Sequence, residues 1–254
     1  MGKYNSSTYR VCPLMEHISG NLDRINRLLS VFGINVNSLP LEYCYGDDEK
    51  LLKPSLNHLL GLIQYLGKTK NHKENDVSKD RAALFYGTED ERKEKTEEAV
   101  STISKKYSRL SPSSRGWYIF EGYTHPDIFI EGEDYIIIGE GKWTENHITV
   151  ETTHLLTANN EYRNQMIRHI QAAINYSNKK VYAFYLVDKD CGYLGDLTKD
   201  EFKKQLSMET VKLSEKDKKG IEESFYGYIT WQDINDLFPE IKFLSKEEID
   251  KKLR

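Results

Sequence analysis

The sequence predicts an α/β protein with a mixed β-sheet flanked by helices, because two buried strands are separated by an amphipathic helix. Residues 135–138 are apolar at every position, as in a central strand that helices cover on both faces. Residues 181–187 are rich in aromatic and β-branched side chains, which favours a second buried strand. A helix over 159–175 would give the right-handed crossover between two parallel strands.

The composition excludes several classes of protein. Of the 254 residues, 30% are charged, and the formal net charge is −4. No apolar run approaches the ~20 residues of a membrane-spanning helix, and the first ten residues lack the apolar core of a signal peptide. We therefore expect a cytoplasmic protein with no membrane partner. The negative net charge argues against a uniformly basic nucleic-acid binder, although a local basic groove is compatible with it.

Residues 1–66 are predicted to form a helical N-terminal region. Apolar residues recur at helical spacing over 21–32 and 54–66, and 39–43 is expected to be an extended connector. No catalytic motif occurs here, so we expect this region to select a substrate, or to bind a partner protein or a second copy of the chain. Residues 67–80 have almost no apolar side chains and are predicted to be an exposed linker or loop.

The remaining residues, 81–254, are predicted to form the main domain with a C-terminal extension. A charged helix is expected over 88–110, with Thr88 and Glu91 as a capping box. The first strand is expected over 116–122. After the strand at 181–187 the pattern predicts two surface helices, then a strand over 225–231, a helix capped by Thr230 and a short terminal helix.

Residues 125–142 are predicted to form a hairpin that organises the site. If Glu133 and Asp134 form the centre of its turn, residues whose numbers sum to 267 lie opposite one another. Asp127 would then face Glu140 on the same side of the sheet, and Lys142 would share that side because it is two residues further on. A slip of one residue would place the carboxylates on opposite faces.

Two carboxylates at close range favour binding of a hard divalent cation. We expect Mg²⁺, with Mn²⁺ as a substitute, held by Asp127, Glu140 and the main-chain carbonyl of Gly141. Such an ion could activate water and neutralise phosphoryl charge, while Lys142 could orient the water or stabilise the transition state. A phosphodiester substrate requires all of these groups. The alternative interpretation is a surface hairpin with solvated charges.

Pro126-Asp127, twelve intervening residues and Glu140-Gly141-Lys142 resemble the motif of the PD-(D/E)XK nuclease superfamily. The segments 143–145 and 162–170 resemble an uncharacterised bacterial subgroup of it. The resemblance implies a restriction-endonuclease-like fold for 81–254 and a metal-dependent nuclease that hydrolyses nucleic acid, with DNA as the expected substrate. The alternative is a catalytically inactive module that binds nucleic acid or protein on the same scaffold.

The resemblance also implies further site residues. A helix before the first strand often supplies another acid in this superfamily, and Glu98 is the candidate; a solvated acidic face is the alternative. The helix after the second hairpin strand can place polar residues near the site, so Arg163, Gln165 and His169 are expected to contact phosphate or water. Pairing of Arg163 with the acidic face of the earlier helix is the alternative. The sequence leaves open the choice of DNA or RNA, the sequence preference and the oligomeric state.

Overall fold

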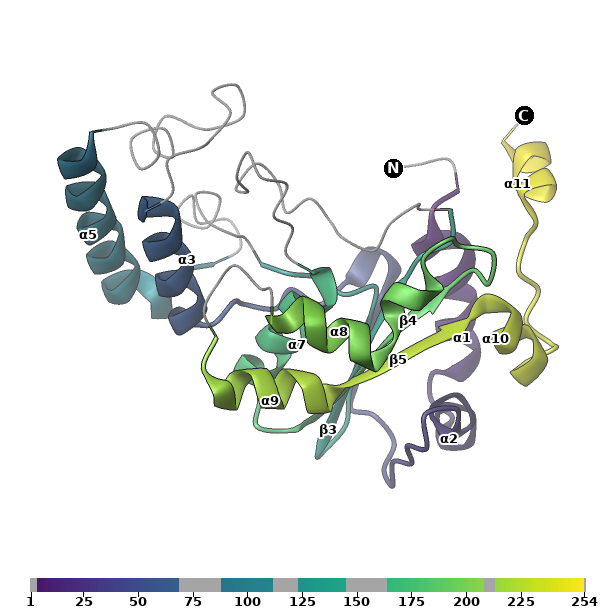
Figure 1. The fold of residues 1–254 in the computed structure, drawn as a ribbon. Helices are drawn as coiled ribbons and strands as arrows, with labels where there is room; N and C mark the ends of the chain where they lie inside the picture. Colours follow the sequence, from purple (N-terminus) through teal and green to yellow (C-terminus); the bar gives the residue numbers. More distant parts are fainter. Residues whose placement is uncertain (1–3, 69–87, 112–122, 145–163, 208–212, 254) are drawn as a thin grey trace.

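The computed structural model describes residues 4–68, 88–111, 123–144, 164–207 and 213–253. Within them the chain is an α/β protein built on one five-stranded mixed sheet in the order β1-β2-β3-β4-β5 (Figure 1). β2 runs antiparallel to both of its neighbours, whereas β3, β4 and β5 run parallel. The predicted α/β class is confirmed at this level. The strands are β1 (Glu42–Tyr45), β2 (Ile128–Glu131), β3 (Tyr135–Gly141), β4 (Lys180–Val187) and β5 (Phe225–Thr230).

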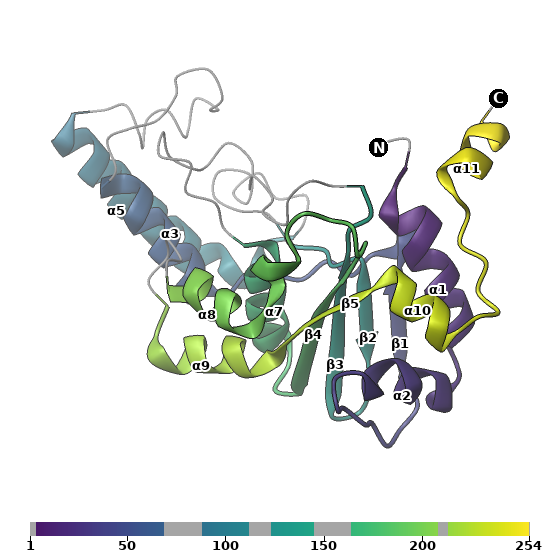
Figure 2. The same cartoon turned by 45° about the vertical axis from the view of Figure 1, so that its right-hand side comes forward.

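Helices cover both faces of this sheet (Figure 2). None of those in the described ranges combines the length and the apolar character needed to cross a membrane. One face is covered by α1 (Cys12–Ile18), α2 (Leu22–Ser30), α10 (Trp231–Leu237) and α11 (Lys246–Lys252). The other is covered by α7 (Gln165–Tyr176), α8 (Lys199–Ser207) and α9 (Glu215–Ser224).

The sheet separates two apolar cores because successive side chains on a strand point to opposite faces. On β2, Ile128 and Ile130 belong to the core under α1 and α2, while Phe129 belongs to the core under α7. All seven residues of β3 are buried, which accounts for its uninterrupted apolar run. The even-numbered residues of β3 point toward α7, and Glu140 follows Ile136 and Ile138 in that series.

The N-terminal region is part of this sheet, which differs from the expected helical addition. Residues 42–45, which overlap the end of the connector predicted over 39–43, form the edge strand β1 and pair with β2 from Glu42↔Glu131 to Tyr45↔Ile128. α1 and α2 pack directly on the sheet. A four-residue strand carries too little alternation to be recognised in the sequence, and its pairing partner lies more than 80 residues further on.

The helix expected over 88–110 is confirmed as α5 (Glu89–Lys106), with the Thr88–Glu91 capping box. It packs against α3 (Leu56–Lys68) through a separate small cluster, so it joins an element from the opposite side of the expected linker. Of that linker, residues 67 and 68 belong to the end of α3, and the remainder lies outside the described ranges. The strand expected over 116–122 also lies outside them.

The predicted elements near the C-terminus are confirmed, and one of them completes the sheet. β5 pairs in parallel with β4, and Thr230 caps α10 through a capping box with Asp233. Ser245 caps α11 in the same way with Glu248. The segment from β5 onward therefore contributes to the central fold, and Ile249 of α11 belongs to the core on the face that α1 and α2 cover.

Arg10 fastens the N-terminal segment to the C-terminal segment beside the end of β3. Its guanidinium lies 3.6 Å from the centre of the Trp143 ring, and its Nη1 donates to the Leu244 carbonyl at 3.0 Å. The residue is only 8% exposed. Burial lowers the pKa of Arg10 to about 10, against the opposing charge of Asp188, so the side chain stays cationic at neutral pH. A buried, hydrogen-bonded and stacked cation of this kind contributes to stability through several contacts.

Replacement of Arg10 by methionine removes the charge and the donors while keeping much of the side-chain volume. We expect Arg10→Met to lower the free energy of unfolding by about 2 kcal/mol, because it leaves the Leu244 carbonyl unpaired and removes the cation from Trp143. For a chain of this size the melting temperature would fall by roughly 4–8 °C. The exposed Arg109 provides the control, and Arg109→Met should change little. Equal melting temperatures for both variants would contradict this role.

Candidate functional site

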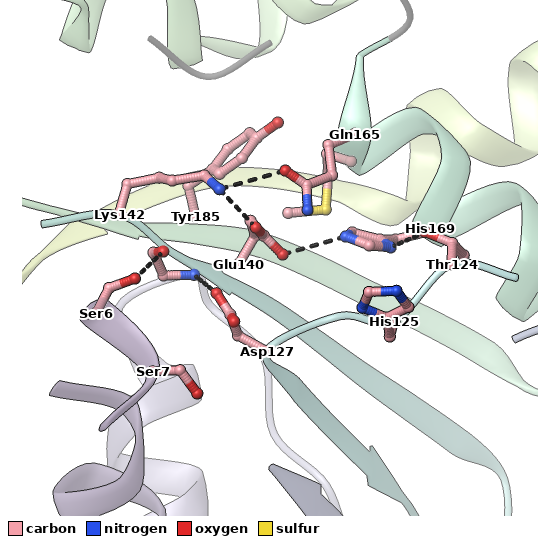
Figure 3. Close-up of polar contacts among 12 residues, drawn as sticks. Ser6, Ser7, Thr124, His125, Asp127, Glu140, Lys142, Gln165, His169 and Tyr185 are labelled. Atoms are coloured by element: carbon pink, nitrogen blue, oxygen red, sulfur yellow. Dashed lines mark hydrogen bonds and ion pairs between the residues drawn. The ribbon is translucent and has the colours of Figure 1, made fainter. Parts of the chain in front are cut away.

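The hairpin has the predicted register. Ile128 pairs with Gly139 and Phe129 pairs with Ile138 across β2 and β3. Asp127 immediately precedes β2, and its Oδ2 accepts a hydrogen bond of 2.8 Å from the Gly141 main-chain N–H (Figure 3). Asp127 and Glu140 therefore approach each other on the face of the sheet that α7 covers, at the ends of neighbouring strands.

The backbone of Lys142 is held on both sides just after β3 ends. Its N–H donates to the Leu186 carbonyl of β4 at 2.8 Å, and its carbonyl accepts from the Trp231 indole at 2.9 Å. The side chain then turns back toward the site, where Nζ lies 2.7 Å from Glu140 Oε1 and 3.2 Å from Gln165 Oε1. Lys142 is thus fixed beside the carboxylate by main-chain as well as side-chain contacts.

α7 brings two further side chains to Glu140. The side chain of Asn164 caps this helix by accepting from the Met166 and Ile167 N–H groups. Gln165 and His169, one turn apart, lie on the same helix face. His169 Nε2 lies 3.1 Å from Glu140 Oε2, and its Nδ1 lies 2.6 Å from Thr124 Oγ1. The two Glu140 oxygens therefore have different partners, Lys142 on one and His169 on the other (Figure 3).

The charges of this cluster follow from burial and pairing. Burial alone would raise the pKa of Glu140, but the Lys142 ammonium and the His169 hydrogen bond outweigh it and lower the pKa to about 2. Burial is also the main influence on His169, and it lowers the pKa of the imidazole despite the adjacent Glu140. An ionised Glu140 beside a neutral His169 results. Because a carboxylate only accepts, the His169 proton lies on Nε2, and the Thr124 hydroxyl donates to Nδ1.

The pKa of Asp127 is shifted in the opposite direction from that of Glu140. Burial and then the negative charge of Glu140 raise the pKa of Asp127 well above its ordinary value. Lys142 and the Gly141 N–H act in the opposite direction but do not compensate. One ammonium therefore faces two carboxylates, and an additional cation would relieve the repulsion between them.

The donor atoms of the site suit a hard cation. Two carboxylates and a carbonyl are all oxygen ligands, which Mg²⁺ prefers, and Mg²⁺ commonly retains several waters. The Gly141 carbonyl accepts a hydrogen bond of 2.8 Å from Ser6 Oγ, and a carbonyl oxygen has two lone pairs. Among the residues that the structure describes, no group of three or more His, Cys, Asp or Glu side chains is arranged to hold a metal ion. The candidate ligands for the cation are therefore two carboxylates, from Asp127 and Glu140, together with the main-chain carbonyl of Gly141.

Glu98 is not brought to this site. It is exposed on α5, where its carboxylate pairs with Lys95 at 2.8 Å. In both views α5 lies beside α3 at one end of the molecule, apart from β3 (Figures 1 and 2). The solvated acidic face, the alternative for this helix, describes Glu98 correctly. The acid was selected by its position before the first strand, whereas α5 takes its place from packing on α3.

The residues expected to contact nucleic acid have different outcomes. His169 is only 1% exposed, so the expected contact with phosphate or water is replaced by contacts with Glu140 and Thr124. Gln165 is partly exposed and bonds to Lys142. Arg163 lies outside the described ranges.

Three residues of the site were not identified from the sequence. Ser6 and Thr124 are isolated hydroxyl residues with no motif around them, and only the folded chain brings them to Gly141 and His169. His125 stands two residues before Asp127; it is exposed and lies 3.2 Å from Glu49, whose hydrogen bond raises the pKa of the imidazole. In the sequence, His125 could have been selected as a site residue because it directly precedes the Pro126-Asp127 pair of the motif.

Comparisons with models of known families, with curated proteins and with solved structures found no match to this chain. The geometry of the site and the resemblance of its motif are therefore the basis for a functional proposal.

The raised pKa of Asp127 predicts that this carboxylate destabilises the fold in the absence of a cation. Below about pH 3.8, the ordinary pKa, the group is protonated in both the folded and unfolded chain and has no effect. As the pH rises through the higher pKa of the folded state, ionisation favours the unfolded chain. We expect Asp127→Asn to raise the free energy of unfolding at pH 8 in chelator by about 1–2 kcal/mol, with a difference that shrinks toward pH 4.

Denaturant titrations of the wild type and Asp127→Asn across this pH range provide the measurement. Asp236→Asn is the matched control, because Asp236 is exposed on α10. A stability difference between the wild type and Asp127→Asn that is independent of pH would contradict the assigned repulsion.

Proposed function

We propose that this protein is a Mg²⁺-dependent nuclease with a restriction-endonuclease-like fold, and that it hydrolyses phosphodiester bonds in DNA. The observation that carries the proposal is the convergence of Asp127, Glu140 and Lys142 on one face at the ends of two neighbouring strands. The motif resemblance supplies DNA as the expected polymer. Mn²⁺ is expected to substitute for Mg²⁺, because it also binds oxygen ligands.

The order of elements supports the proposed fold. An antiparallel hairpin carries the two acids, a helix follows, and the next strand runs parallel to the second hairpin strand. The carboxylates lie where the ends of central strands meet loops, a common position for catalytic groups on a rigid scaffold. This is the arrangement that the motif resemblance implies.

In the proposed reaction, Asp127, Glu140 and the Gly141 carbonyl would hold the cation. When bound, Mg²⁺ would activate water and neutralise developing charge on the phosphoryl oxygens. Release of the proton from Asp127 would accompany its binding, since a ligating carboxylate must be ionised. Ser6 would keep the Gly141 carbonyl oriented through its hydrogen bond.

Lys142 would provide the positive charge on the protein side. The contacts with Glu140 and Gln165 hold its ammonium within the cluster. From there it would orient the attacking water or donate to the phosphorus-bound oxygens as negative charge develops on them. Because the ammonium is positioned before substrate arrives, little reorganisation would be needed in the transition state.

A second candidate function is a catalytically inactive module that binds nucleic acid or protein. The observation that favours it is the existing pairing of both Glu140 oxygens, one with Lys142 and the other with His169. A carboxylate whose partners satisfy it could serve as a structural ion pair. Metal-dependent hydrolysis by the pure protein would exclude this candidate.

A cleavage assay tests the proposal and separates the two candidates. The wild-type chain is incubated with labelled single-stranded DNA, double-stranded DNA and RNA, each with Mg²⁺, with Mn²⁺ or with chelator. We expect metal-dependent cleavage of DNA, and a loss of roughly 10²–10⁴-fold in Asp127→Asn, Glu140→Gln and Lys142→Met, because each removes a charge from the reacting centre.

Lys203→Met is the matched control for the loss of a lysine. Lys203 forms an exposed ion pair with Glu222 on the α8–α9 surface, so its replacement should leave cleavage unchanged. Equal cleavage by the wild type and all three site variants would reject the site. A folded wild type that binds DNA or a protein without cleaving in either metal would favour the inactive module.

A further inference from the structure

We infer that His169 and Thr124 act as a positioning pair that fixes the orientation of the Glu140 carboxylate for cation binding, without contacting the nucleic acid. This role rests on the proposed function, because it concerns the same metal site. It assigns to His169 a task different from the phosphate or water contact that the motif resemblance implied. It also brings in Thr124, which no motif indicated.

The burial of the three side chains is the first argument. His169 is 1% exposed, Glu140 is 2% exposed and Thr124 is 5% exposed. An imidazole so covered is out of reach of a polymer, yet both of its nitrogens have partners within 3.1 Å. The energetic cost of burying an imidazole is offset here by two directed hydrogen bonds.

The anchoring of the pair is the second argument. Thr124 forms an isolated bridge with Leu52, in which the main-chain N–H of each residue donates to the carbonyl of the other at 2.8 and 2.9 Å. Its hydroxyl therefore starts from a fixed backbone. His169 is held on α7 between Ile167 and Ile170, which are fully buried. Because the imidazole ring is rigid and is held at Thr124 and on α7, its Nε2 has a fixed position beside Glu140.

The direction of the hydrogen bonds is the third argument. Because the Glu140 carboxylate only accepts, His169 Nε2 donates to its Oε2, while Nδ1 lies 2.6 Å from Thr124 Oγ1 on the other side of the ring. With Lys142 on Oε1, rotation of the Glu140 carboxylate is restricted at both oxygens. A carboxylate offers about four acceptor sites, so these two hydrogen bonds leave others for a cation.

The position of His169 beside a proposed metal ligand is the fourth argument. His169 contacts one oxygen of Glu140, and Lys142 contacts the other. Hydrogen-bond partners of metal ligands commonly orient them, and their replacement typically lowers metal affinity 10–100-fold. His169 is thus placed to hold a proposed ligand in position.

Mn²⁺ affinity and DNA affinity, measured separately on the full chain, test this role. Free Mn²⁺ is followed by electron paramagnetic resonance, and DNA binding by fluorescence anisotropy in Ca²⁺. We expect His169→Leu to weaken Mn²⁺ binding by about 10–100-fold while DNA binding in Ca²⁺ changes far less. His169→Gln keeps an N–H donor near the Nε2 position and should recover much of the Mn²⁺ affinity.

Thr124→Val, which is nearly isosteric, and Thr124→Ser, which keeps the hydroxyl but lacks the methyl group, repeat the test. Removal of the hydroxyl in Thr124→Val should weaken Mn²⁺ binding, and Thr124→Ser should retain it. His17→Leu is the matched control. His17 lies on α1, and its Nε2 is 2.9 Å from Glu240 Oε1, so it belongs to a histidine–glutamate pair outside the site. Its Mn²⁺ affinity should equal that of the wild type.

The outcomes distinguish this inference from the proposed function. Unchanged Mn²⁺ affinity in folded His169→Leu and Thr124→Val would overturn the positioning role and leave the proposed nuclease intact. Weakened DNA binding with normal Mn²⁺ affinity would also overturn it, in favour of a nucleic-acid contact. Absence of Mn²⁺ binding by the wild type would overturn both.

Discussion

The repulsion between two carboxylates on one face of the sheet is the central physical constraint in this structure. Asp127 and Glu140 meet at the ends of neighbouring strands, and one ammonium, from Lys142, faces both of them. The contacts with Lys142 and His169 keep Glu140 ionised, while burial and the charge of Glu140 raise the pKa of Asp127. Two carboxylates that repel each other lower the stability of a fold, and perturbed carboxylates of this kind cluster at functional sites. A divalent cation bound between them would offset the repulsion.

Contacts from distant segments of the chain hold the backbone beside this pair. The backbone at the end of β3 is held by Ser6 on the Gly141 carbonyl and by Trp231 on the Lys142 carbonyl. Arg10 stacks on the next residue, Trp143, and joins the two ends of the chain there. The N-terminal region, which the sequence suggested was an addition, is thus part of the wall of the site.

The features predicted correctly from sequence are local ones. The hairpin register followed from the turn position and the period of two, and α5 from the capping box at Thr88. The features that were missed depend on packing between distant segments. β1 is recognisable only beside β2, and Glu98 was misplaced because α5 takes its position from α3. His169 was expected to contact polymer or solvent, but it lies beside Glu140 and is buried, and this burial depends on the whole α7–sheet interface.

Cation binding between Asp127 and Glu140 is tested most directly by an anomalous difference map from a crystal of the wild-type protein soaked in Mn²⁺. We predict one strong peak within about 2.0–2.4 Å of carboxylate oxygens from both Asp127 and Glu140, close to the Gly141 carbonyl, with His169 still bonded to Glu140. A map with no peak between the two carboxylates at saturating Mn²⁺, or with Lys142 alone bridging them, would contradict it.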